Sequence, residues 1–327
     1  MSELPILAGD VGGTNTRLTL LSPDGKKLLR HEVLPSREHP SLESAMRAFL
    51  GDARVDRACL GIAGPVLDGR CTATNLPWVV DERVLQKKLR IRRVKLLNDL
   101  VAAAYGAMTL PKKRLASVWG ERLPSGKGTV AIIAAGTGLG EAVLVWDGER
   151  HVPMATEGGH TDFAPRSDLE MRLLAHLQRQ LKKRVSYERV VSGPGLGNVY
   201  DFFVESDGVR ETQPNVRALA TAPDRNALIA ELATSGKSRA AGRALDLFFS
   251  LYGAEAGNLA LKCLPSGGLF VSGGIAAKLR DRLMRGDFVA SFLGKGRMEP
   301  LLRKIPIAIV LDSDVGLKGS ARVATGL

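Results

Sequence analysis

The sequence contains few cysteines and few aromatic residues, and its apolar runs are short. Only Cys59, Cys71 and Cys263 occur in 327 residues, and no C-x-x-C pair indicates zinc or a redox motif. Widely spaced cysteines in odd number favour reduced thiols. No apolar run approaches the ~20 residues that span a bilayer, and no basic segment precedes an apolar one near Met1. We therefore expect a cytoplasmic protein without a membrane partner.

Long basic blocks are also absent, although the formal net charge is +12. The strongest clusters, Lys112–Arg114 and Lys182–Arg184, are short and adjoin helical patterns, so we interpret them as solvated helix ends. A nucleic-acid surface would interleave basic and aromatic residues, and aromatic residues make up only 5% of the chain. We expect no nucleic-acid partner, whereas the charge permits an anionic ligand such as a nucleoside triphosphate.

Strands alternate with helices along the chain, which predicts an α/β architecture. Beyond the glycine turns described below, strands are expected at 55–63, 94–97 and 305–311. Helices are expected at 41–50, 100–108, 167–183, about 195–205, about 215–235, 238–263 and 316–324.

One pattern occurs twice, at 5–21 and at 129–145: an apolar strand enters a Gly-rich turn and leaves as a second strand. The repeat and the chain length both predict two related lobes. We place the small lobe at 1–110, completed by about 312–327. The large lobe is then 111–311, and it begins with a loose connector up to Gly128.

Glycine-rich turns follow three of the predicted strands. Successive backbone N–H groups in such turns form concave anion sites, and glycine lets the backbone approach a ligand closely. A single turn of this kind is ordinary, but three at strand ends favour phosphate binding. The turns are Gly12-Gly13-Thr14, Gly136-Thr137-Gly138-Leu139-Gly140 and Gly273-Gly274.

Two common phosphate-binding designs do not fit these turns. Gly236-Lys237-Ser238 looks like the end of a P-loop, but Glu231 stands where the first glycine should be. A dinucleotide-binding pattern starting at Gly136 would need a small residue at position 141, which is Glu141. The remaining design holds phosphates in hairpin turns, one from each lobe.

The same turns resemble the motifs of the sugar kinase, actin and heat-shock chaperone superfamily. Gly9-Asp10-Val11-Gly12-Gly13-Thr14-Asn15 resembles its first phosphate motif, Ala135–Gly140 its second, and Ser272–Ile275 its adenosine motif. More closely, the chain resembles bacterial glucokinases from end to end. The strings that carry this resemblance are Leu97-Asn98-Asp99, Glu157-Gly158-Gly159-His160-Thr161-Asp162-Phe163-Ala164-Pro165 and Glu188-Arg189-Val190-Val191-Ser192-Gly193-Pro194-Gly195-Leu196.

The resemblance implies a two-lobed actin-like ATPase fold, which is ribonuclease H-like, with the ligands in a cleft between the lobes. It implies ATP-dependent phosphorylation of glucose to glucose 6-phosphate, and a homodimer is common in the family. The related ROK family of kinases and repressors carries a Cys-rich zinc motif after a Glu-x-Gly-His string. No cysteine lies between 71 and 263 here, so we expect His160 to serve a sugar rather than a metal.

Asp99 is the candidate general base. It comes directly after a short strand, where an α/β sheet places its crevice, and the resemblance makes it the group that takes the proton of the attacking hydroxyl. The residues alone favour a cap for the following helix instead, through Asn98-Asp99. The resemblance reverses that preference.

The resemblance also implies a set of ligands for the hexose. Carboxylate, amide and imidazole groups bind sugar hydroxyls by directional hydrogen bonds. From the residues alone, His160 as a structural histidine and Glu188 as a surface residue remain open, and Asn75 is a further candidate near the sugar. The implied ligands are Asn98, Asp99, Glu157, His160 and Glu188.

For the nucleotide, the resemblance implies that glycine turns hold Mg-ATP. Asp10 would orient Mg²⁺ through water, because this ion keeps several waters; as the alternative, Asp10 is a turn residue. The implied nucleotide contacts are Gly12, Gly13, Thr14, Asn15, Thr137 and Gly138 at the triphosphate and Gly273 and Gly274 under the adenosine. A kinase for another hexose or N-acetylhexosamine, and a non-catalytic sugar sensor on this fold, remain alternatives.

Overall fold

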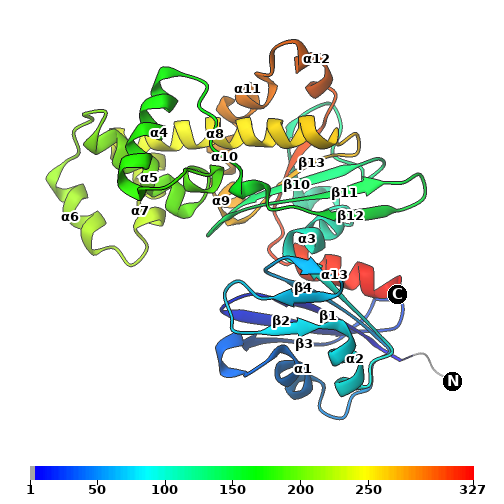
Figure 1. Cartoon of the computed structure of the whole chain (residues 1–327). Helices are drawn as coiled ribbons and strands as arrows, with labels where there is room; N and C mark the ends of the chain where they lie inside the picture. Colours follow the sequence, from blue (N-terminus) through cyan, green and yellow to red (C-terminus); the bar gives the residue numbers. More distant parts are fainter. Residues whose placement is uncertain (1–3) are drawn as a thin grey trace.

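The computed structural model describes residues 4–327; residues 1–3, which the expected small lobe includes, lie outside the described residues. Across the described chain the strands form three sheets, in the orders β3-β2-β1-β4-β8, β12-β11-β10-β13-β14-β9 and β5-β6-β7 (Figure 1). The strands are β1 Ile6–Val11, β2 Asn15–Leu21, β3 Leu28–Pro35, β4 Arg57–Ile62, β5 Val66–Leu67, β6 Arg70–Thr72, β7 Val79–Asp81, β8 Arg93–Asn98, β9 Leu115–Trp119, β10 Val130–Ala135, β11 Leu139–Trp146, β12 His151–Ala155, β13 Gly268–Ser272 and β14 Ile307–Val310.

Helices cover the faces of the sheets, and short 3₁₀ turns connect several elements. The α-helices are α1 Leu42–Leu50, α2 Glu82–Leu89, α3 Asp99–Ala107, α4 Asp168–Leu181, α5 Gly193–Glu205, α6 Gln213–Thr221, α7 Arg225–Thr234, α8 Arg239–Cys263, α9 Gly274–Lys278, α10 Arg280–Leu283, α11 Asp287–Leu293, α12 Glu299–Leu302 and α13 Val315–Thr325. The 3₁₀ turns are η1 Ser36–Glu38, η2 Lys112–Arg114, η3 Gly158–His160, η4 Tyr187–Arg189 and η5 Gly296–Met298.

The two larger sheets repeat one arrangement. In the first sheet, β1 pairs antiparallel with β2 and parallel with β4. In the second, β10 pairs antiparallel with β11 and parallel with β13. The strand–turn–strand pattern seen twice in the sequence is therefore a hairpin in each sheet, and each hairpin carries one of the glycine turns.

Helices α3 and α13 pack against each other between the two larger sheets (Figure 1). Apolar side chains of β1, α3 and β10, among them Ala8, Ala102 and Ile132, join in one buried cluster there. Glycine permits the contact between the helices, because a Cβ on Gly319 would lie 1.7 Å from the carbonyl oxygen of Ala102. The outer face of the first sheet buries a cluster shared with α1 and α2, and the second sheet packs against α5, α8 and α11.

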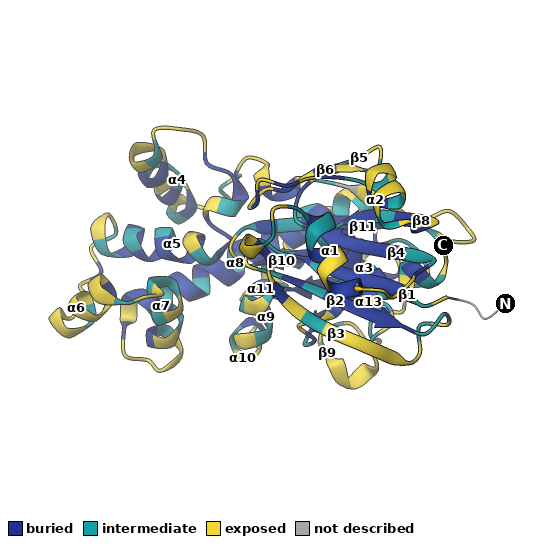
Figure 2. Cartoon of the chain, turned by 90° about the horizontal axis from the view of Figure 1, so that it is seen from below, coloured by how far each residue is buried: buried dark blue, intermediate teal, exposed yellow. Residues whose placement is uncertain are grey.

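The structure corrects several sequence expectations. The helix expected at about 215–235 is two helices, because Pro223 cannot donate a backbone hydrogen bond and Asp224 caps α7 by accepting from Ala227 N at 3.0 Å. The connector at 111–128 contains β9, which pairs with β14 at the edge of the second sheet. Strand β3 was not predicted; its side chains are largely exposed, as expected at a sheet edge (Figure 2). Within residues 4–327, no helix is long and apolar enough to cross a membrane.

Candidate active site

A cleft of about 590 Å³ lies where elements of both larger sheets converge. Its walls come from the β1–β2 turn, the β8–α3 junction, the β10–β11 turn, the loop around η3, and η4. Most of the predicted site residues therefore share one cavity. Those that line it are Gly12, Gly13, Asn98, Asp99, Thr137, Gly138, Glu157, His160, Glu188 and Gly273.

At the β8–α3 junction both predicted side chains accept a hydrogen bond from Leu100 N, Asp99 through Oδ1 at 2.9 Å. Asn98 is the N-cap of α3: its Oδ1 accepts from Leu100 N at 2.9 Å, and its Nδ2 donates to the Gly64 carbonyl at 3.2 Å. Asp99 is the first residue of the helix and lines the cleft. Burial raises the pKa of Asp99 to about 6, and the charges of Asp10 and Glu157 add to the shift. Such a carboxyl group can exchange a proton near neutral pH.

Glu157 precedes the 3₁₀ turn η3 and His160 is its last residue; both present exposed side chains to the same cleft. Their Oε2 and Nε2 atoms are 3.9 Å apart. Glu188 reaches the cleft from η4, and its Oε2 accepts a hydrogen bond from Leu139 N at 3.1 Å. A polar ring of acids, an amide and an imidazole therefore faces the end of α3, which suits a ligand rich in hydroxyl groups.

The first glycine turn is closed by a hydrogen bond from Gly12 N to Asn15 O at 3.0 Å. The Asn75 side chain packs on this turn, since a Cβ on Gly13 would lie 2.7 Å from the Asn75 Cβ, and Asn75 also lines the cleft. Thr14 and Asn15 belong to the turn, but they are not among the residues that line the cavity. The structure thus brings the two glycines, rather than all four turn residues, to the cleft.

Asp10 lies on β1, two residues before Gly12, and does not line the cavity. Its Oδ2 accepts from Arg17 Nη1 at 3.1 Å. Burial and the charge of Asp314 raise the pKa of Asp10, and Arg17 opposes that shift. Among the described residues, no group of three or more His, Cys, Asp or Glu side chains forms a metal cage. A single carboxylate beside a phosphate turn fits Mg²⁺, which retains water and binds mainly through phosphates.

The second glycine turn connects the cleft to a neighbouring cavity of about 680 Å³. Gly136 and Thr137 line both cavities, and Gly193 N, at the start of α5, donates to Gly136 O at 2.7 Å. Gly274 lines only the second cavity, at the N-terminus of α9. The two cavities together suit an elongated ligand with its phosphates at the shared turn.

Sequence reasoning missed two parts of this region. Helix α7 forms a wall of the second cavity through Asn226 and Ala230, and no motif marks that helix. Glu141 lines the cleft although it is only 3% exposed. The sequence did contain a signal for Glu141, because a charged residue within an apolar strand pattern is unusual.

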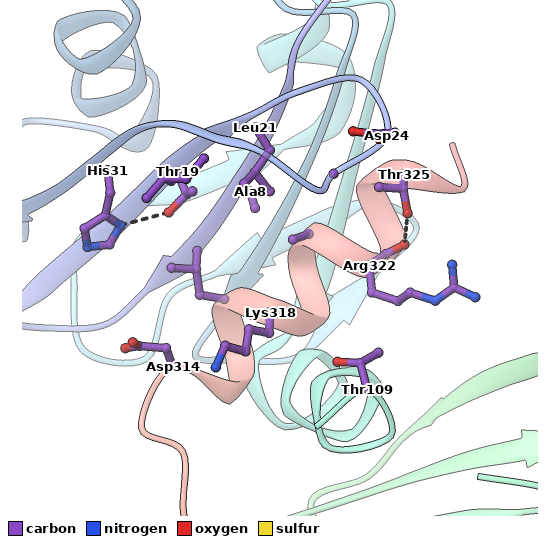
Figure 3. A pocket seen from close by; sticks show the side chains of 14 residues that line it. Ala8, Thr19, Leu21, Asp24, His31, Thr109, Asp314, Lys318, Arg322 and Thr325 are labelled. Carbon is purple, nitrogen blue, oxygen red and sulfur yellow. Dashed lines mark hydrogen bonds between the residues drawn. The ribbon is translucent and has the colours of Figure 1, made fainter. Parts of the chain in front are cut away.

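A separate cavity of about 610 Å³ lies between the first sheet and α13 (Figure 3). It has an apolar floor that includes Ala8 and Leu21, and Lys318 lies at its edge. The His31 Nδ1 and Thr19 Oγ1 atoms hydrogen-bond at 2.9 Å on one wall. None of the predicted site residues is among those that line it within the described chain.

The fold and the cleft define the class of protein first. A solved ROK-family glucokinase from Streptomyces griseus, in complex with glucose and AMPPNP, superposes with a TM-score of 0.65 at 20% identity, covering 99% of this chain and 100% of that chain. This likeness establishes the fold, which is that of the actin-like ATPase sugar kinases.

Sequence comparison then identifies the family. The family profile described as Glucokinase matches residues 7–326. A glucokinase of a Nostoc species is 39% identical over 341 residues, which cover 98% of this chain and 99% of the relative. A glucokinase structure from an Antarctic psychrotroph has a TM-score of 0.84 and 30% identity, with 99% of both chains covered. The chain belongs to the glucokinase family, and it is an enzyme of the kinase class.

Proposed function

We propose that this enzyme transfers the γ-phosphoryl group of ATP to the 6-hydroxyl of glucose, forming glucose 6-phosphate and ADP. One observation carries the proposal: a carboxyl group with a raised pKa, Asp99, shares a cleft with glycine turns from both larger sheets. Phosphoryl transfer depends mainly on positioning and charge stabilisation. The names of the relatives, and the glucose and AMPPNP in the Streptomyces griseus complex, support the choice of substrates.

Asp99 acts as the general base. Its carboxylate accepts the proton of the 6-hydroxyl as that oxygen attacks the γ-phosphorus and the bond to ADP breaks. Asn98, Glu157, His160 and Glu188 hold the other hydroxyls, which orients the 6-oxygen for attack in line with the leaving group. The exposed carboxylate of Glu157 next to His160 supports this role, because both side chains are open to the cleft.

The glycine turns bind the nucleotide. Gly12 and Gly13 on one side, and Thr137 and Gly138 on the other, face the triphosphate. Thr14 and Asn15 support the first turn, where Asn15 O accepts the N–H of Gly12. Gly273 and Gly274 lie under the adenosine. Asp10 would hold Mg²⁺ through water, and that ion would neutralise charge on the phosphates.

We infer that glucose closes the cleft. The moving units are residues 1–110 with 312–327 on one side and 111–311 on the other. Closure would exclude water, which otherwise competes with the sugar for the phosphoryl group. Small-angle scattering with and without glucose tests the motion; an unchanged radius of gyration and an unchanged ATPase rate would contradict it.

We further infer that the enzyme works in the cytoplasm as a homodimer. Cys59, Cys71 and Cys263 are all free thiols, and the first two are buried, which agrees with a reducing compartment. Family resemblance is the support for the dimer. Multi-angle light scattering tests it, and a monomer mass at micromolar concentration would exclude it.

The test of the activity is a coupled assay for ADP release with glucose, mannose, fructose and N-acetylglucosamine. Asp99→Asn keeps the shape of the side chain but cannot accept the proton, so kcat with glucose should fall by roughly 10²–10⁴-fold while glucose and ATP still bind. Asp24→Asn, in an exposed turn, is the matched control. Turnover with another sugar alone would change the substrate, and binding without turnover in the wild type would indicate a sensor.

A further inference from the structure

Two carboxyl groups meet in the interior of the protein behind the sugar-binding residues. Glu141 on β11 is 3% exposed and Glu255 on α8 is 0% exposed. The two side chains lie within hydrogen-bonding reach of each other. The Oε1 atom of each has no donor among the described residues. Two adjacent carboxylates repel each other, whereas one proton shared between the two groups makes a hydrogen bond and leaves a single negative charge.

The surroundings decide which group holds that proton. Asn258 Nδ2 donates to Glu255 Oε2 at 2.8 Å, and Lys262 Nζ is 3.9 Å from Glu255 Oε1. These contacts favour Glu255 as the carboxylate. Glu141 has no comparable donor, and burial together with the charge of Glu255 raises its pKa well above the ordinary range of a glutamate. Glu141 is therefore the protonated partner.

Glu141 and Glu255, called here the carboxyl pair, are linked to both segments that carry the proposed sugar-binding acids, one directly and one through Asn258. On one side, a Cβ on Gly158 would lie 1.9 Å from Glu141 Oε2, so this carboxyl group touches the residue that follows Glu157. On the other side, Asn258 Nδ2 also lies 3.2 Å from Tyr187 Oη. Tyr187 precedes Glu188 directly in η4.

We propose that the carboxyl pair is a positioning device, in which one shared proton holds the segments of Glu157 and Glu188 in the geometry that binds the sugar. The inference rests on the proposed glucose phosphorylation, and it adds a control of sugar affinity by pH. Loss of the proton would leave two adjacent buried negative charges, so that Glu141 must move away from Glu255. Because Glu141 packs against Gly158, that movement displaces Glu157.

Other titratable groups face the carboxyl pair, and their behaviour makes the prediction specific. Burial raises the pKa of the tyrosines and the cysteine among them, so these groups stay neutral where the carboxyl pair loses its proton. Burial lowers the pKa of Lys295, so a variant is needed to separate its titration from that of the carboxyl pair. The groups are Tyr252, Lys262 and Cys263 on α8, Tyr187 on η4, and Lys295 after α11.

The experiment measures KM for glucose and kcat from neutral to alkaline pH. In the wild type, KM should rise by up to about tenfold per pH unit once the carboxyl pair has lost its proton, while kcat changes less than about twofold. Glu141→Gln supplies a permanent donor to Glu255, so its KM should match the wild type at neutral pH and stay flat at alkaline pH. Glu170→Gln is the control. Glu170 is a buried glutamate on α4 that pairs with Arg166, and its variant should retain the rise in KM.

Infrared spectroscopy gives a readout that does not depend on turnover. The band of a protonated carboxyl group should be present at neutral pH and absent in Glu141→Gln, which removes the group that holds the proton. A rise in KM that persists in Glu141→Gln, or no such band in the wild type, would overturn the proposal. If the wild type shows the band but does not phosphorylate glucose, the proposed function fails and the shared proton stands.

Discussion

Glu188 accepts a hydrogen bond from the backbone N–H of Leu139, with 3.1 Å between Oε2 and N. This contact ties a carboxylate proposed to bind the sugar to the glycine turn proposed to hold the triphosphate. A side chain at position 138 would force Glu188 to move, because a Cβ on Gly138 would lie 2.5 Å from Glu188 Oε2. The parts of the cleft proposed for the sugar and for the nucleotide therefore share one structural element.

Gly138→Ala should weaken glucose phosphorylation by displacing Glu188. Hydrogen bonds to charged groups contribute about 1.5–3 kcal/mol, so kcat/KM for glucose should fall roughly tenfold to a hundredfold. Gly136→Ala is the matched control in the same turn, since a Cβ there meets nothing within 4 Å. Equal losses in the two variants would show that the effect comes from the turn backbone and not from Glu188.

The pH profile of the wild type should have an acid limb set by Asp99. The general base must be ionised, and its pKa is raised to about 6, so activity is present above that value and is lost as the pH falls through it. kcat/KM should then fall about tenfold per pH unit below the pKa. Initial rates in buffers of constant ionic strength test this. A limb near the ordinary pKa of an aspartate would remove Asp99 as the base.

Asn98→Ala should reduce both stability and sugar affinity. The substitution removes the cap of α3 and the hydrogen bond to Gly64 O. Loss of an N-cap costs about 1 kcal/mol, which urea unfolding measures. Ser41→Ala is the control, because it removes the cap of α1, where Ser41 Oγ accepts from Ser44 N at 3.2 Å. Ser41 is far in sequence from every predicted site residue. This variant should lose similar stability with unchanged KM for glucose; a raised KM in both variants would point to general loosening.

Ala230→Phe should weaken ATP binding while leaving glucose binding intact. Ala230 lines the second cavity from α7. Gly274, proposed to lie under the adenosine, lines the same cavity, so a phenyl group at position 230 would occupy the space that the adenosine needs. Overpacking of this kind costs about 1–3 kcal/mol, so KM for ATP should rise roughly tenfold. Ala220→Phe places the same side chain on the exposed face of α6. An unchanged KM for ATP in Ala230→Phe would place the nucleotide elsewhere.

Much of the fold follows from local sequence patterns. The hairpins that carry the glycine turns could be predicted, because apolar strand patterns and turn glycines set the backbone conformation within a few residues. A helix was predicted at 41–50, and the structure confirms it as α1, with Ser41 as its N-cap. The break between α6 and α7 was missed although Pro223 marks it. Strand β9 was also missed, because an edge strand depends on its partner β14 more than on its own pattern.

The sequence by itself determined the α/β class, the glycine turns at strand ends, and the position of Asp99 after a strand, because each depends on backbone preferences of neighbouring residues. Tertiary structure alone decided the rest. It placed Asp99 in one cleft with the glycine turns of both larger sheets. It also brought Glu141 of β11 against Glu255 of α8. Such contacts depend on how distant elements pack, and burial then sets the protonation of the groups that meet.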